Sequence, residues 1–379
     1  MSAEDLAGLP AVARLMVRLC EIPSPSRQEG PVAEAVRAEL RDLGAEVIED
    51  DAAAALGAGC GNIVARFPAT AEGGVPIMFG AHLDTVPVTG PIEVELVDGE
   101  LTNRHDAILG GDNKAAVAVL LQAMRRVRDE GRPHGGVELL FTPCEEIGLR
   151  GAAAFDPGAL RARFGFVYDH SGPIGSVVAA APSLHRLWAE FVGRAAHAGI
   201  APEAGRSALL AASKAVARMP QGRIDSETTV NVGTIEGGTA TNVIAERCRI
   251  TAEARSRDER TLSVQLTAML DALAWAAAEC EVDLETRAER EFTAYRLGEG
   301  DPQVRMALDV LEGLGHPARL VASGGGSDVN ALIANGFPAV NLCNAMVDIH
   351  TPDERIAVRS LEQMLDITLG LIDAAATAE

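Results

Sequence analysis

Apolar positions follow two patterns along most of the chain. Some segments repeat apolar residues every three to four positions, which predicts helices, and short apolar runs between them predict buried strands. The predicted helices are 5–20, 29–43, 114–128, 302–314, a segment after Ser327, and 360–375. The predicted strands are 62–67, 76–81, 137–142, 165–168 and 338–342. Strands that alternate with helices predict an α/β sheet covered by helices on both faces.

The middle of the chain has a different order of elements. Its predicted strands are 184–192, 228–235, 247–254 and 282–287, and its predicted helices are 207–219 and 260–278. The order β-α-β-β-α-β is that of a ferredoxin-like split βαβ sandwich. We therefore predict a small domain at 182–290, inserted into a larger α/β domain formed by 1–181 and 291–379. The cleft between two such domains could open and close.

Composition narrows the classes of partner. The 379 residues include 54 Asp and Glu but only 33 Lys and Arg, a formal net charge of −21. Nucleic acids and anionic membranes attract basic surfaces, so neither is expected as a partner. No apolar run approaches the ~20 residues of a membrane span, and no secretory signal is expected. Six scattered cysteines without a C-x-x-C pair favour a cytoplasmic protein without a thiolate metal site.

His82 and Asp84 begin a series of polar residues that follow predicted strands. The segment A-H-L-D-T-V-P places both at the carboxyl end of strand 76–81, the edge where open α/β sheets bind ligands. Alternate residues of an extended chain point to the same side, so Asp84 can orient the His82 ring and leave its other nitrogen for a metal ion. By itself, H-x-D is more commonly explained by a structural His–Asp pair.

Carboxylates follow in L-G-G-D-N-K-A-A, which contains Asp112, and in F-T-P-C-E-E-I-G, which contains Glu145 and Glu146. Asp112 could simply cap the helix that begins near Lys114, or it could bridge two metal ions. The adjacent glutamates could form a solvated acidic turn. At a ligand-binding edge, however, they would repel each other unless cations were near, so one could bind a metal while the other acts as a base.

Asp169 and His350 complete the pattern, each after another predicted strand. A helix cap, a turn residue or an exposed histidine could explain either residue separately. Five strand ends that each carry a histidine or a carboxylate are better explained together, as two metal ions with one shared bridge. Nitrogen and oxygen ligands without thiolate suit zinc, with cobalt or manganese as alternatives.

These segments together resemble the peptidase T-like branch of the dinuclear zinc exopeptidases. That family also contains carboxypeptidase G, acetylornithine deacetylase and succinyl-diaminopimelate desuccinylase, and the resemblance covers essentially the whole chain. The motifs that carry it are A-H-L-D-T-V-P, L-G-G-D-N-K-A, E-E-I-G-L-R-G, I-H-T-P, A-A-H-A-G-I-A-P-E-A-G-R-S-A, G-R-I-D-S-E-T-T, I-E-G-G-T-A-T-N-V-I and E-A-R-S-R-D-E. The resemblance implies a mixed-sheet catalytic domain with an inserted lid and dimerisation domain, and a homodimer formed through that lid.

The resemblance also implies a role for each site residue. His82 and Asp169 would hold one zinc ion, Glu146 and His350 would hold the other, and the Asp112 carboxylate would bridge them. The peptide bond between Asp112 and Asn113 would be cis. Glu145 would be the general base and Asp84 the partner of His82.

A hydroxide shared by the two zinc ions would attack an amide carbonyl, and Glu145 would carry a proton to the leaving amine. His197 of the inserted domain would donate to the oxyanion, in some members from the partner subunit. Asn242 and Arg255 would bind substrate, with Arg255 gripping a carboxylate. The loop 323–328, with Gly325 and Gly326, could cradle a carboxylate on its N–H groups or be a flexible turn with a Ser or Asp cap.

Three functions are consistent with these residues. The first is a metal-dependent exopeptidase for short peptides, acting as an aminopeptidase as peptidase T does. The second is a deacylase of N-acyl amino acids with the same metal chemistry. The third, a non-catalytic metal-binding protein on the same scaffold, is disfavoured because all five ligand positions and Glu145 are present.

Overall fold

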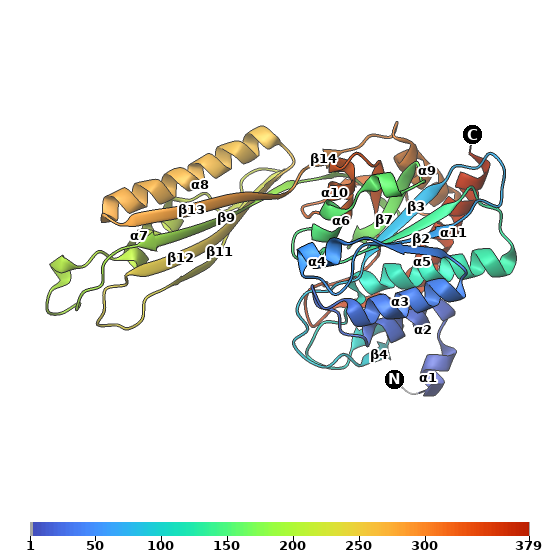
Figure 1. The fold of residues 1–379 in the computed structure, drawn as a ribbon, viewed down its shortest axis with the longest axis horizontal. Coiled ribbons are helices and arrows are strands. Elements are labelled where there is room, and N and C mark those ends of the chain that lie inside the picture. The colour runs from blue at the N-terminus through green and yellow to red at the C-terminus, as the bar shows by residue number, and fades with distance from the viewer. Residues whose placement is uncertain (1–2, 379) are drawn as a thin grey trace. The chain divides into compact units, whose positions relative to one another are not determined.

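The computed structural model describes residues 3–378, which divide into two compact units (Figure 1). Of these residues, unit 1 contains 3–179, 296–323 and 327–378. Unit 2 contains Ala180–Tyr295 together with Gly324–Gly326. The chain therefore leaves unit 1 for one long insertion and returns to it, and the short loop Gly324–Gly326 joins unit 2 a second time.

The large sheet of unit 1 has nine strands and is mixed, as expected. Its order is β1-β2-β6-β3-β7-β16-β8-β14, with β15 paired to β8. The strands are β1 (Glu46–Glu49), β2 (Ile63–Phe67), β3 (Ile77–His82), β6 (Val137–Thr142), β7 (Phe164–His170), β8 (Ser176–Ala181), β14 (Tyr295–Arg296), β15 (Arg319–Ala322) and β16 (Ala339–Cys343). The four central strands β6, β3, β7 and β16 run parallel, so their carboxyl ends share one edge.

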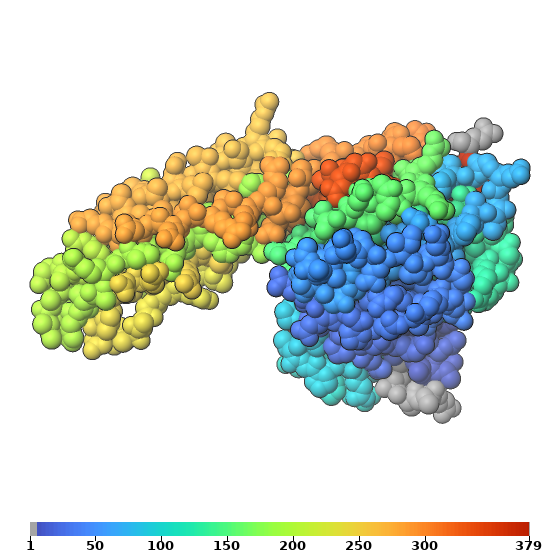
Figure 2. All heavy atoms as spheres, in the orientation of Figure 1, coloured from blue at the N-terminus to red at the C-terminus, as the bar shows by residue number. Residues whose placement is uncertain are grey.

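Helices cover this sheet and bury its core. They are α1 (Ala3–Gly8), α2 (Ala11–Cys20), α3 (Gly30–Asp42), α4 (Ala52–Leu56), α5 (Gly111–Glu130), α6 (Arg150–Ala154), α9 (Pro302–Gly313), α10 (Asp328–Ala334) and α11 (Val358–Thr377). Helix α5 contacts β3 on one side and α2 and α11 on the other, which explains why Ala115–Leu121 is buried all round. In Figure 2 the N-terminal part of the chain (blue) forms much of the visible surface of unit 1.

Unit 2 has the predicted elements in the predicted order with one unpredicted addition, the two-residue strand β10, and its antiparallel sheet has five strands, β10-β11-β12-β9-β13. Its elements are β9 (Ser183–Val192), α7 (Ala208–Arg218), β10 (Gly222–Arg223), β11 (Thr228–Gly237), β12 (Arg247–Ser256), α8 (Glu259–Cys280) and β13 (Asp283–Phe292). Helices α7 and α8 pack on the sheet and form a separate core that includes Leu187, Phe191 and Leu273.

Helix α8 is, within residues 3–378, the one helix long and apolar enough to cross a membrane by length and composition. Core helices of other proteins meet the same criterion. Its buried side chains, among them Met269 and Leu273, belong to the core of unit 2.

The structure corrects several predicted elements. The helix predicted at 5–20 is two helices, because Pro10 follows α1 and immediately precedes α2. A small sheet of β4 (Val94–Val97), β5 (Glu100–Asn103) and β17 (Arg355–Ala357) was not predicted, nor was β8. The three strands of the small sheet have only three or four residues each, too few for a clear periodicity.

Candidate metal centre

Six side chains from distant segments meet at the carboxyl edge of the parallel strands. His82 ends β3, Glu145 and Glu146 follow β6, Asp169 is near the end of β7, Asp112 is in the first turn of α5, and His350 follows β16. We call these six residues the metal-ligand cluster. Three overlapping groups within it each offer ligand atoms that lie within 4.8 Å of one another. The groups are His82, Asp112 and Asp169; His82, Glu145 and Glu146; and Asp112, Glu146 and His350.

Asp112 lies between the two histidines. Its Oδ1 is 3.5 Å from Nε2 of His82, and its Oδ2 is 3.3 Å from Nε2 of His350. His82 Nε2 is also 3.5 Å from Oδ1 of Asp169, and His350 Nε2 is 3.1 Å from Oε1 of Glu146. The two oxygens of one carboxylate thus face two separate histidine–carboxylate pairs.

Asp84 connects two strand ends beneath the cluster. Its main-chain carbonyl lies 2.9 Å from Nδ1 of His82, and its carboxylate Oδ1 lies 3.6 Å from the same nitrogen. The carboxylate accepts hydrogen bonds from the backbone N–H groups of Glu145 and Glu146 and from the hydroxyl of Ser26. Asp84 therefore fixes both the His82 ring and the turn that carries the two glutamates.

The glycines before Asp112 allow its unusual backbone. Gly110 has a φ of 70°, and a Cβ on Gly111 would lie 2.7 Å from the methyl carbon of Met346. The peptide bond between Asp112 and Asn113 is cis, which confirms what the resemblance implies. Asp112 and Asn113 have non-helical dihedral angles, so the regular helix begins near Lys114, as predicted.

Burial and like charges shift the pKa values of the cluster. Burial, with nearby Asp169, raises the pKa of Glu145 well above its usual value, and burial raises the pKa of Asp169 to about 7. Contacts with Asp112 and Glu146 raise the pKa of His350 to about 10. Burial would lower the pKa of His82, but Asp112, Asp169 and Asp84 hold it well above its usual value. Four acidic side chains and two imidazoles thus share one largely buried site, and the charge of each group depends on its neighbours.

The donor set fits divalent cations. Asp112 Oδ1 and Glu146 Oε1 are buried and face the imidazole nitrogens of His82 and His350 at 3.5 and 3.1 Å, and within residues 3–378 neither oxygen accepts a hydrogen bond of normal geometry. Buried carboxylate oxygens are costly unless they are paired with a cation or a donor. Imidazole nitrogens and carboxylate oxygens with no thiolate are the ligands of zinc and similar metals. The residues present can therefore hold metal ions.

His197 and Asn242, expected to contact substrate, are neighbours in unit 2. His197 forms a β-bridge with Val243, and the N–H of Ala198 donates to the carbonyl of Asn242 at 2.9 Å. Both are exposed, and both lie at the end of the unit-2 sheet where β12 begins.

Arg255 lies at the other end of β12, where its neighbour Ser256 pairs with Ser183. Its guanidinium makes a bidentate contact with Glu253, with N···O distances of 2.8 and 3.1 Å. A substrate carboxylate would have to replace Glu253 there.

The glycine loop packs within unit 2. A Cβ on Gly326 would lie 2.5 Å from the ring of Phe292, so this position has no room for a side chain. Gly325 precedes it in the same loop. The N–H of Ser327 donates to Oδ1 of Asn330 at the start of α10, a contact typical of a helix cap.

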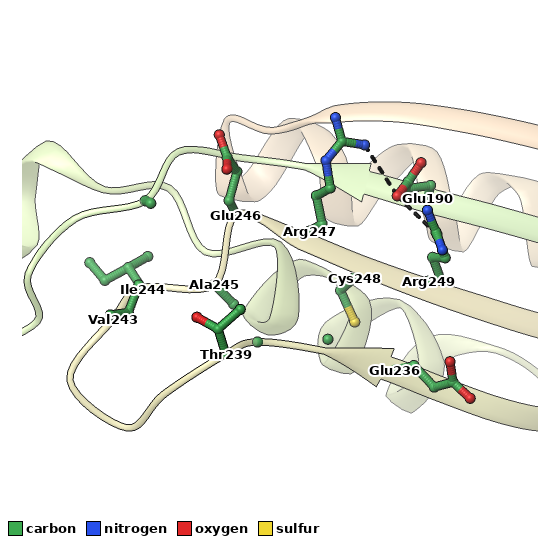
Figure 3. Close-up of a pocket in the computed structure, with 13 residues that line it drawn as sticks. Glu190, Glu236, Thr239, Val243, Ile244, Ala245, Glu246, Arg247, Cys248 and Arg249 are labelled. Atoms are coloured by element: carbon green, nitrogen blue, oxygen red, sulfur yellow. Dashed lines mark hydrogen bonds and ion pairs between the residues drawn. The ribbon is translucent and has the colours of Figure 1, made fainter.

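A separate pocket of about 410 Å³ in unit 2 lies beside the loop that carries Asn242 (Figure 3). Arg247 and Arg249 both contact Glu190 on its wall, at 3.2 and 3.0 Å. None of its lining residues belongs to the metal-ligand cluster.

Sequence reasoning missed two buried acids beside the cluster. Asp328 accepts a hydrogen bond from the hydroxyl of Thr142 at 2.5 Å, and burial raises its pKa to about 6. Glu354 accepts from the N–H groups of Gly110 and Asp112. Asp328 was considered only as part of a loop or as a helix cap, and Glu354 follows His350 in an acidic, exposed-looking segment, so no local signal marked either as buried.

With this geometry established, comparison with known proteins identifies the class. Peptidase family M20/M25/M40 matches residues 78–374, and the chain belongs to this family. It is a metal-dependent peptidase of the peptidase T-like kind.

Several relatives are similar over nearly their whole length. The aminopeptidase PepT of Bacillus cereus shares 36% identity with a TM-score of 0.86, covering 97% of this chain and 98% of that one. A tripeptidase of Staphylococcus aureus shares 31% identity with a TM-score of 0.91 and the same coverage. The uncharacterized protein YqjE of Bacillus subtilis is 35% identical over 360 residues, covering 95% of this chain and 97% of its own.

Proposed function

We propose that the chain is a peptidase T-like exopeptidase, acting as an aminopeptidase on short peptides with two zinc ions per subunit. His82 and Asp169 would hold one ion, Glu146 and His350 the other, and Asp112 would bridge them. The observation that carries this proposal is the position of Asp112, with one carboxylate oxygen near His82 and the other near His350. Cobalt or manganese would fit the same nitrogen and oxygen donors.

Glu145 is proposed as the general base. When bound, the ions would supply Lewis-acid activation of water and of the scissile carbonyl. Glu145 accepts the proton of the attacking water and returns a proton to the leaving amine nitrogen, so its carboxylate is regenerated. Burial favours the protonated carboxyl, and the raised pKa of Glu145 suits a group that must both take and give a proton.

The positions of the substrate-binding residues support a homodimer. Arg247 and Arg255 are eight residues apart on one strand, about 27 Å at ~3.4 Å per residue. His197 and Asn242 lie beyond the Arg247 end, so one short peptide cannot contact both them and Arg255 within a single subunit. If all three act on substrate, His197 and Asn242 must come from a partner. Within residues 3–378, β10 pairs with Thr229 and Val230 alone, so the rest of this edge of β11 is available to such a partner.

The substrate proposal rests on Arg255 and on the relatives. An aminopeptidase and a tripeptidase are among the similar structures, and a bidentate arginine suits the terminal carboxylate of a short peptide. The glycines Gly325 and Gly326 are proposed to line the same subsite. Six free cysteines agree with a cytoplasmic location, which stays a prediction.

Replacing Glu145 with Gln tests the mechanism. We expect kcat for a tripeptide to fall by about 10²–10⁴-fold, because the amide cannot accept the proton, while the zinc content stays at the wild-type value. Unchanged kcat would refute Glu145 as the base.

A panel of tripeptides, dipeptides and N-acyl amino acids tests the substrate class. Turnover of acylated amino acids alone would replace the peptidase proposal with the deacylase proposal.

A further inference from the structure

Glu354 joins two parts of the metal-ligand cluster that are far apart in sequence. Its side chain is buried, with the residue 1% exposed. One carboxylate oxygen accepts the N–H of Gly110 at 2.8 Å and the other accepts the N–H of Asp112 at 2.9 Å. These two N–H groups belong to the first turn of α5 and to the residue before it, where a helix has no internal acceptors for its donors.

The same residue closes the turn that carries His350. Val347 and Arg355 exchange two backbone hydrogen bonds across this turn, and the N–H of Glu354 donates to the carbonyl of Thr351. Glu354 therefore stands at the base of the His350 turn while its carboxylate holds the backbone of Asp112. The two residues that it connects, Asp112 and His350, approach each other to 3.3 Å.

A buried carboxylate in this position needs compensation, because Asp112 beside it is also acidic. The fully buried side chain of Lys114 provides a positive charge that interacts with Glu354, and its Nζ donates to the carbonyl of Ile22 at 2.7 Å. The carboxyl of Glu354 accepts hydrogen bonds from backbone N–H groups of the Asp112 segment and is not itself one of the six groups of the metal-ligand cluster.

We propose that Glu354 is a positioning residue for metal binding: it fixes the Asp112 backbone to the His350 turn so that one carboxylate can face both halves of the site. This inference rests on the proposed two-metal function. Residues that orient metal ligands typically contribute 10–100-fold to metal affinity.

The test is Glu354→Gln in the full-length protein. Its amide can accept only one of the two N–H groups and presents its own donors to the other. We expect zinc affinity, measured by competition with a chromogenic chelator, to fall by 10–100-fold. The visible absorption spectrum of the cobalt-loaded protein should also change, because the arrangement of ligands is altered. Asp353→Asn is the matched control: it removes the same charge from the adjacent exposed residue and should leave affinity and spectrum unchanged.

The outcomes separate this inference from the proposed function. If wild type binds zinc and folded Glu354→Gln binds it equally tightly, the positioning role is refuted while the two-metal function stands. If wild type binds no divalent cation, the proposed function fails and the inference with it. If Glu354→Gln does not fold, Glu354→Asp decides, because it keeps the charge but its shorter side chain cannot reach both N–H groups. Wild-type zinc affinity in Glu354→Asp would overturn the inference.

Discussion

Asp112 shows how the chemistry of one side chain depends on the residues that hold it. Burial would raise the pKa of its carboxyl, but the imidazoles of His350 and His82 keep that pKa below its usual value. The carboxylate is therefore ionised, and each of its oxygens faces a different histidine. An ionised carboxylate whose two oxygens point to different sides is suited to bridging two cations.

Metal binding to this site should release protons. In the metal-free protein the pKa of His350 is raised to about 10 and that of His82 well above its usual value, so both imidazoles are charged at pH 7.5. Metal ions bind only the neutral ring, so we expect at least one proton, and up to about two from the histidines, to be released. Zinc affinity should therefore rise with pH up to about 10.

Calorimetric titration of zinc in buffers of different ionisation enthalpy measures this release, and His350→Ala should lower it by about one proton. Binding without proton release would show that the imidazoles are neutral in the metal-free protein.

The raised pKa of His350 also has a consequence for the stability of the metal-free fold. His350 stabilises the fold below its usual pKa of 6.5, and this contribution is lost as the pH rises through about 10.

At the scale of single residues, the sequence predicted those whose position follows from a strand end. His82, Glu146 and Asp169 could be placed at one edge because the strands before them are strongly apolar. Glu354 could not be placed, because its burial depends on Gly110 and Asp112, more than 240 residues earlier. Contacts of that range leave no periodicity in the local sequence.

Among the elements, α6 constrains the turn that carries Glu145 and Glu146. Gly151 lies in this helix, and a Cβ there would come within 2.2 Å of the carbonyl oxygen of Pro143, two residues before Glu145. We expect Gly151→Ala to lower the free energy of unfolding by about 1–3 kcal/mol, because the backbone before Glu145 must move.

Urea unfolding of the metal-free protein measures this effect against Gly298→Ala. No atom lies within 4 Å of a Cβ on Gly298, so that control should change the free energy of unfolding by less than ~0.5 kcal/mol. Equal stability of the two variants would mean that the turn before Glu145 adjusts freely.

The longest elements were all predicted from their own periodicity. These elements have at least ten residues each, which is enough for a clear apolar periodicity. They are the helices α5, α8 and α11 and the strands of unit 2 other than the two-residue β10. The short strands β4, β5 and β17 were missed, although β17 and β5 pair over a sequence distance of some 250 residues. Such strands are defined by their partners and not by their own composition.

For the whole molecule, unit 2 places its two groups of expected substrate contacts at opposite ends of one sheet. Arg255 is near the strand end where Ser256 pairs with Ser183, and the His197–Asn242 pair is beyond the start of β12. A site that uses both groups requires two copies of the chain. The sequence could suggest each residue by resemblance, but only the strand register shows that they are too far apart to act on one substrate from one subunit.

Mixing two inactive variants tests whether subunits share a site. His197→Ala keeps its own Glu145, and Glu145→Gln keeps its own His197. In a mixed dimer with exchanged histidines, the site of the first variant receives an intact His197 from the second and becomes active. With free exchange at equal concentrations, half the dimers are mixed and each has one active site, so activity should recover to about a quarter of wild type. If His197 instead serves its own subunit, every site in the mixture lacks one of the two groups and activity stays at the level of the separate variants.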